Sequence, residues 1–214
     1  PWQWGSTGMS VEVCVDEPAM QRKRAMTLRS DEWSGWRLGE PIARLWGAER
    51  RTTSNLRAWI RNRLLERSIL LDTLNVDEQR LSEFVRRLQK IGPCLLFGHA
   101  HSLYLLATYL QERRMDAIRP KGILSTAMVL HDWERQRIEA VFDCRVTNRY
   151  GCEEVSLIAS ECELHQGLHI NSDSIFTEIE TGGAHEVADV LDEHEAVGGG
   201  VERGERLADH LRVE

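Results

Sequence analysis

Apolar residues in this chain occur in short continuous runs and in longer stretches with helical spacing. The short runs predict strands. They cover residues 11–15, 42–47, 93–97, 122–124, 144–147, 155–159 and 169–171. Strict alternation over residues 175–179 predicts one further strand.

The longer stretches place apolar residues three and four positions apart, which predicts amphipathic helices. They cover residues 18–37, 54–69, 102–114 and 132–142, and another helix begins after residue 77. Pro18 suits the first turn of its helix, and Asp77 or Asn75 suits an N-cap. The side chains expected on the buried faces are Met20, Met26, Trp33, Trp36, Leu56, Ile60, Leu64, Leu65, Leu81, Phe84, Val85, Leu88, Leu103, Leu106 and Leu110.

Because strands alternate with helices, we predict an α/β fold, with a largely parallel sheet and flanking helices. Ligands of such sheets bind beyond the carboxyl ends of the strands. Three loops fall at that edge, at residues 98–102, 125–127 and 150–154. Their convergence predicts a ligand site.

The pattern changes at Thr181. Residues 181–214 are rich in Gly, Glu, Asp and His, include three consecutive glycines at 198–200, and lack apolar periodicity. We therefore predict a folded domain over residues 1–180 and a divergent, loosely ordered tail over residues 181–214.

Composition excludes several classes of protein. The chain has 214 residues, of which 42% are hydrophobic and 29% charged, as in ordinary soluble domains. A net charge of -7 argues against a nucleic-acid partner. The chain has no apolar run long enough to cross a bilayer, and its first residues do not form a signal peptide. We expect a cytoplasmic protein without a membrane partner, and the missing initiator Met suggests a fragment.

Five cysteines form no C-x-x-C pair, and an odd number argues against a disulfide framework. This composition fits a reducing compartment. Cys94 and Cys144 lie in apolar runs, where we expect them to be small core residues.

The sequence Gly5-Ser6-Thr7-Gly8 is the first candidate phosphate site. Glycines free the backbone amides to turn toward a phosphate, and the hydroxyl groups add donors. Taken alone, these four residues fit an ordinary turn equally well.

The second candidate site lies in the run from Asn148 to Glu154, which follows a predicted strand. The ring of Tyr150 can stack on adenine beside Gly151, and the carboxylate of Glu154 or Glu153 can ligate magnesium. The alternative is a β-turn with solvated acidic side chains.

Two further loops can complete a ligand site at the same edge. The small residues Ser125, Thr126 and Ala127 let a flat base approach the backbone, although any strand end can carry such a turn. His99 and His101 follow a buried strand and are candidates for a substrate pocket. Exposed or structurally paired histidines are the alternative.

Cys162, His165 and His169 are candidate zinc ligands, since thiolate and imidazole are the groups that zinc prefers. Cys152 becomes a fourth ligand only if the chain folds back. The alternative is that this segment binds no metal.

Taken together, these motifs resemble the adenylate-forming superfamily, and within it the phenylacetate-CoA ligase-like branch, which includes capsular polysaccharide biosynthesis proteins. The similar segments are residues 5–15, 33–47, 93–110, 119–130 and 141–171. The order and spacing of these segments carry the resemblance.

The resemblance implies ATP-dependent activation of a small carboxylic acid and transfer to coenzyme A. It assigns the loop Gly5–Gly8 to the ATP phosphates, Ser125–Ala127 and Tyr150–Gly151 to adenine, and Glu154 to magnesium. His99 and His101 would line the acyl pocket, and some relatives bind a structural metal near Cys162 and His169. A homodimer is left open.

The sequence also departs from this family. No Lys follows Gly8, and the ribose-binding Asp and C-terminal catalytic Lys expected of the family are absent. We therefore expect an incomplete N-terminal domain that is inactive alone. The alternatives are a non-catalytic remnant that binds a nucleotide or partner, and a metal-stabilised structural module.

Overall fold

The computed structural model describes residues 2–4, 10–12, 14–47, 67–116, 118–152, 154–181 and 184–186. Seven strands form one sheet in the order β4-β3-β5-β6-β7-β8-β9. Their bounds are β3 Ile42–Trp46, β4 Ile69–Asp72, β5 Leu95–His99, β6 Gly122–Thr126, β7 Val146–Cys152, β8 Ser156–Glu161 and β9 Leu168–Ile170. The five strands β4, β3, β5, β6 and β7 are parallel to one another. Strands β8 and β9 extend the sheet in antiparallel pairing.

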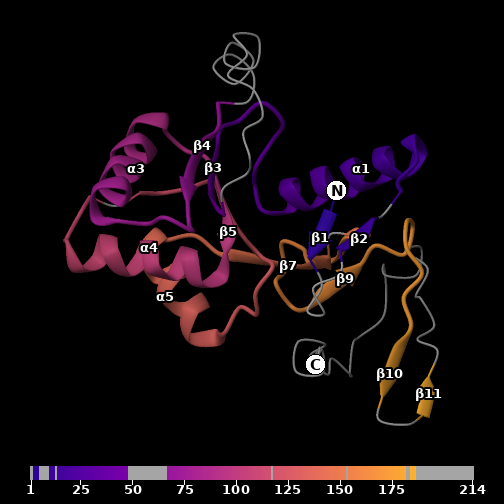
Figure 1. The fold of residues 1–214 in the computed structure, drawn as a ribbon. Helices are drawn as coiled ribbons and strands as arrows, with labels where there is room; N and C mark the ends of the chain where they lie inside the picture. The colour runs from indigo at the N-terminus through magenta and orange to yellow at the C-terminus, as the bar shows by residue number, and fades with distance from the viewer. Residues whose placement is uncertain are drawn as a thin grey trace.

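Two short hairpins accompany this sheet (Figure 1). Strand β1 (Trp2–Trp4) pairs antiparallel with β2 (Ser10–Glu12), and β10 (Ile179–Thr181) pairs antiparallel with β11 (Ala184–Glu186). The predicted strand at residues 175–179 is wrong, because residues 175–178 are irregular and only Ile179 belongs to β10.

The helices begin and end at residues with local reasons to do so. They are α1 Glu17–Trp33, α3 Glu78–Ile91, α4 Ala100–Glu112 and α5 Asp132–Phe142. The carboxylate of Asp77 accepts a hydrogen bond from the backbone N–H of Arg80, which confirms the expected N-cap of α3. Gly92 ends that helix with a φ of 81°, a backbone conformation that favours glycine.

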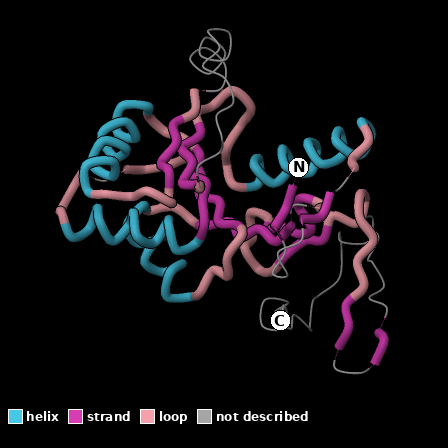
Figure 2. The backbone as a smooth tube through the Cα atoms, in the orientation of Figure 1, coloured by secondary structure: helices cyan, strands magenta, loops and turns pink. Residues whose placement is uncertain are grey.

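Helices α3, α4 and α5 lie on one face of the parallel strands, and α1 lies beside the antiparallel strands (Figures 1 and 2). Val146 of β7 belongs to the apolar core under α4 and α5, whereas Arg149, three residues later, bonds to α1. Because strand side chains alternate between faces, α1 covers the opposite face. The α/β fold with flanking helices is thus confirmed.

The core confirms most of the expected buried positions. Phe84, Val85, Leu88, Leu103, Leu106, Leu110, Met26, Trp36 and Cys94 are buried. Met20 is exposed, and Trp33, Leu81 and Cys144 are only partly buried. None of the described helices is long and apolar enough to cross a membrane.

Strand β4 corrects the expected helix at residues 54–69, because Ile69 begins a strand that pairs with β3. Residues 54–66 of that predicted helix lie outside the described residues. Most of the tail after residue 181 lies outside them too, so the domain boundary stays a prediction.

Candidate functional site

The carboxyl ends of β5, β6 and β7 bring three of the predicted loops side by side. His99 lies opposite Thr126 in the register of β5 and β6, and Ser125 lies opposite Asn148 in that of β6 and β7. Tyr150 follows two residues after Asn148 on the same strand. The predicted adenine residues from two distant parts of the sequence therefore occupy adjacent strand ends.

Ser125 is fully buried, and its hydroxyl has no hydrogen-bond partner within the described part of the chain. The chain then leaves the sheet: Thr126 is partly exposed, and Ala127 is exposed with a φ of 62°. Because few residues other than glycine adopt a positive φ, this bend is a defined feature of the loop.

Tyr150 and Gly151 lie at an irregularity where β7 turns toward β8. The register with β8 shifts between them, as in a β-bulge. A Cβ atom at Gly151 would lie 2.3 Å from the backbone oxygen of Ser156, so only glycine fits. The bulge leaves Tyr150 partly buried at the edge of the sheet.

Glu154 lies in the turn between β7 and β8 and is partly exposed. The Lys23 ammonium donates to its backbone oxygen at 2.7 Å. The pKa of the Glu154 carboxyl is lowered by a hydrogen bond from its own backbone N–H, with further contributions from Cys152 and Lys23. An ionised carboxylate at the surface is chemically suited to a magnesium ion.

A pocket of about 620 Å³ lies between α1 and this turn. It combines the charged side chains of Arg22, Lys23 and Glu154 with an apolar wall. The wall is formed by Val15, Ala19, Met26, Val155 and Ile175. A pocket of this size and mixed character can accommodate a small organic ligand.

A buried polar cluster fixes α1 to β7 beneath the site. Arg149 donates to Ser30 Oγ at 2.7 Å and forms an ion pair with Asp31. Ser160 of β8 also bonds to Ser30. Burial raises the pKa of Asp31, although the guanidinium of Arg149 opposes that rise. Sequence reasoning missed Lys23, Asp31 and Arg149, because no periodicity or spacing connects residues so far apart.

His99 and His101 occupy different surroundings. The ring of His99 stacks on that of Trp46 at a centroid distance of 4.2 Å, and burial lowers the pKa of His99. His101 instead faces α5, with its Nδ1 atom 3.3 Å from Glu134 Oε1. The two predicted pocket residues therefore contact different neighbours. Trp46 accompanies His99 because it ends the neighbouring strand β3.

The candidate zinc ligands form a pair, not a cluster. His169 Nε2 lies 3.2 Å from Cys162 Sγ, and His165 instead contacts Glu161. Among the residues that the structure describes, no group of three or more His, Cys, Asp or Glu side chains is arranged to hold a metal. Zinc, which prefers four ligands, gains no support.

The predicted phosphate-loop residues Gly5, Ser6, Thr7 and Gly8 lie outside the described residues, as does Glu153. The strands that precede and follow this loop are paired, with Trp4 opposite Ser10. The helix that packs against Glu154, α1, follows the second of these strands in the chain.

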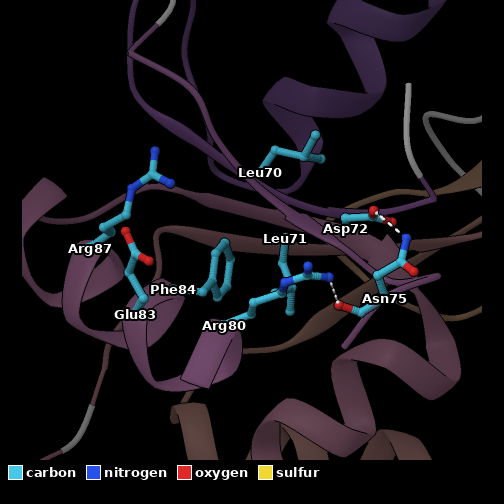
Figure 3. A pocket seen from close by; sticks show the side chains of 8 residues that line it. All are labelled: Leu70, Leu71, Asp72, Asn75, Arg80, Glu83, Phe84 and Arg87. Carbon is cyan, nitrogen blue, oxygen red and sulfur yellow. Dashed lines mark hydrogen bonds between the residues drawn. The ribbon is translucent and has the colours of Figure 1, made fainter. Parts of the chain in front are cut away.

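A second hollow, of about 320 Å³, lies between the edge strand β4 and α3 (Figure 3). Its polar side chains partly satisfy one another: Asn75 donates to Asp72 Oδ2, and Arg80 donates to the backbone oxygen of Asn75. Figure 3 shows Glu83 and Arg87 to the left of Phe84, on the side of the hollow away from Asp72 and Asn75. None of the predicted site residues that the structure describes lines this hollow.

Comparison with known proteins gives one sequence relative and several structural ones. No family model matches the sequence. Protein CapK of Staphylococcus aureus is 27% identical over 97 residues, which is 45% of this chain and 21% of CapK.

The structural relatives include 2-hydroxyisobutyryl-CoA ligase in an open conformation with 2-HIB-AMP and CoA. The TM-score is 0.58 at 13% identity, over 78% of this chain and 37% of the ligase. The same ligase in its postadenylation state gives a TM-score of 0.54 at 15% identity, over 78% of this chain and 36% of the ligase. These similarities establish the fold: the chain has the architecture of a portion of these ligases and spans little more than a third of their length.

Proposed function

We propose that this chain is the nucleotide-handling part of an adenylate-forming acid–CoA ligase. The protein would activate a carboxylic acid with ATP through an acyl-adenylate and transfer the acyl group to coenzyme A. The observation that carries the proposal is the adjacency of Ser125–Ala127 and Tyr150–Gly151 at neighbouring strand ends. The shared fold with a ligase that holds 2-HIB-AMP and CoA supports it.

In the first step a carboxylate oxygen attacks the α-phosphorus of ATP, and the bond to pyrophosphate breaks. In the second step the thiol sulfur attacks the acyl carbon, the bond to AMP breaks, and the thiol proton is released. Neither step needs a protein nucleophile. The protein contributes by orienting the reactants and by stabilising charge on the phosphate oxygens.

We assign Gly5–Gly8 to the phosphates, Ser125–Ala127 and Tyr150–Gly151 to adenine, and Glu154 to magnesium. His99 and His101 would contact the acyl substrate. The position of Glu154 in an exposed turn fits a magnesium ligand, because its carboxylate is ionised and reachable. Magnesium bound with ATP would neutralise phosphate charge.

We further place the chain in the phenylacetate-CoA ligase-like branch, with the similarity to CapK as support. The acyl group itself is not specified by the residues at hand. The odd number of cysteines and the lack of a C-x-x-C pair support a reducing, cytoplasmic location.

Because the chain spans 37% of the ligase, the complete reaction is proposed for a whole protein. For the 214-residue chain we expect weak binding of ATP with magnesium and no thioester formation. Calorimetric titration of ATP, with and without magnesium, tests this expectation.

The decisive variant is Glu154→Gln, which removes the charge but keeps the shape of the side chain. We expect it to abolish the gain in ATP affinity that magnesium provides. The matched control is Glu112→Gln, since Glu112 is exposed at the end of α4, at the opposite edge of the sheet. If the wild-type chain binds no ATP, the proposed function fails for this chain, and a partner-binding remnant or a structural module is favoured instead. If Glu154→Gln leaves the magnesium dependence unchanged, the metal role of Glu154 is wrong.

A further inference from the structure

Helix α1 holds the segment from Arg149 to Glu154 at both of its ends. At the first end, the Arg149 guanidinium is buried against Ser30 and Asp31. At the other end, the Lys23 ammonium donates to the backbone oxygen of Glu154 at 2.7 Å. The segment between these contacts carries Tyr150 and Gly151.

The contact at Lys23 acts on the turn that follows the paired part of β7. Glu154 and Val155 form the turn between β7 and β8, beyond the last pair of the ladder, Cys152 with Ser156. A hydrogen bond from an ammonium group is stronger than one between neutral groups. It therefore restrains the backbone from which the Glu154 side chain projects.

Lys23 is also separate from the groups that would contact a nucleotide base. It comes from the middle of α1, and its partly buried stem lies in the wall of the 620 Å³ pocket that Glu154 also lines. Its position 131 residues before Glu154 in the chain shows that the contact is created by the fold.

We propose that Lys23 is a positioning residue that fixes the β7–β8 turn so that the Glu154 carboxylate presents to the magnesium–nucleotide complex. The proposal rests on the proposed function, in which Glu154 is the magnesium ligand. Groups that orient a metal ligand commonly change metal affinity by about 10- to 100-fold when they are removed. Lys23 acts through Glu154, without contacting the nucleotide.

The test compares Lys23→Met, which keeps the aliphatic stem, with Lys23→Arg, which keeps a charged donor. The matched control is Arg24→Met, which removes one positive charge from the next position on α1, where the side chain is exposed. ATP binding to the full chain is titrated calorimetrically over a range of magnesium concentrations. Hydrogen exchange of the backbone around residues 154–158 is measured without ligand.

We expect Lys23→Met to weaken the magnesium-dependent part of ATP affinity about tenfold and to speed exchange in the turn. A tenfold loss corresponds to about 1.4 kcal/mol of binding free energy. ATP affinity without magnesium should stay within about twofold, since Lys23 does not contact the nucleotide. Lys23→Arg should restore most of the magnesium dependence, and Arg24→Met should match the wild type. In a Glu154→Gln background, Lys23→Met should add no further loss, as expected of two residues that act together.

Three outcomes overturn the proposal. Equal behaviour of Lys23→Met and Arg24→Met would mean that the contact positions nothing. An equal loss of ATP affinity with and without magnesium would mean that Lys23 contacts the phosphates directly. A wild-type chain that binds no ATP with magnesium would instead remove the proposed function, and the role of Lys23 with it.

Discussion

The two halves of the sheet, which meet at β7, are joined to their helices by different kinds of contact. In the parallel half, α3, α4 and α5 pack on the strands mainly through one continuous apolar core, to which α5 adds an ion pair between Arg135 and Glu161 of β8. This core includes Phe84, Leu88, Leu103, Leu106, Ile123, Ile138 and Phe142. In the antiparallel half, α1 is joined to β7 and β8 by the buried polar side chains of Ser30, Asp31, Arg149 and Ser160.

This difference indicates where the position of a helix against its strands is fixed most closely. Apolar burial has no preferred direction, so packed helices tolerate small shifts. Buried hydrogen bonds and ion pairs are directional and costly to leave unmade, so they define one arrangement of α1 against β7. The candidate residues Tyr150 and Glu154 belong to the directional half. The comparison predicts that each half fails in its own way when mutated.

The largest effect is expected for Arg149→Met, because it leaves the Asp31 carboxylate buried without its cation. Removing one partner of a buried pair costs about 3–5 kcal/mol of the free energy of unfolding. The loss should depend on pH. Burial already raises the pKa of Asp31 above its usual 3.8, and removal of Arg149 raises it further.

A group whose pKa is raised in the folded state contributes stability below its unfolded pKa and loses it as the pH rises through the folded value. Urea unfolding should therefore show a larger deficit at pH 8 than at pH 4. The double variant Arg149→Met with Asp31→Leu should recover most of the loss, since no buried charge remains. A deficit that is the same at both pH values would mean that the cluster acts only by packing.

The second effect concerns the apolar half. Leu106→Ala removes a fully buried side chain from α4, which should cost about 2–5 kcal/mol through lost burial and a residual cavity. The control is Leu105→Ala on the same helix, where the side chain is 52% exposed and the expected loss is below about 1 kcal/mol. Urea unfolding at pH 4 and pH 8 measures both. A pH-dependent deficit for Leu106→Ala would break the distinction between the halves.

The same division separates what the sequence could predict from what it could not. Periodicity located α5 at residues 132–142 and α3 after its cap Asp77, because both helices bury a regular apolar stripe. It missed β4, whose apolar run Ile-Leu-Leu continues the helical pattern expected before it. Four residues are too few for spacing to distinguish a strand from a helix.

The candidate site could likewise be predicted only in part from the sequence. The strand-end loops at Ser125 and Tyr150 could be predicted, because parallel strands present their carboxyl ends at one edge. The register of these strands and the steric need for Gly151 could not be predicted, because both depend on contacts between separate segments of the folded chain. The contacts from Lys23 and Arg149 had no sequence signal, since polar pairing across more than 100 residues leaves no periodic trace.

The smallest effect is expected for an exposed ion pair in the apolar half, between Lys121 and Glu40. It joins the start of β6 to the segment before β3, but both side chains are partly exposed. Exposed pairs contribute about 0–1 kcal/mol, so Lys121→Met should cost little of the free energy of unfolding.

The hydrogen bond from Lys121 lowers the pKa of Glu40, with a second contribution from the backbone of Arg37. A carboxyl whose folded pKa is lowered contributes stability above its usual 4.5 and loses it as the pH falls through the folded value. The difference between wild type and Lys121→Met in urea unfolding should therefore be small at pH 7, smaller at 0.5 M salt, and should vanish as the pH falls through the lowered pKa of Glu40. Lys90→Met, at an exposed position of α3, is the control for the change in net charge. If Lys121→Met cost as much as Arg149→Met, charge rather than burial would decide the stability of these pairs, and the two halves would no longer differ in kind.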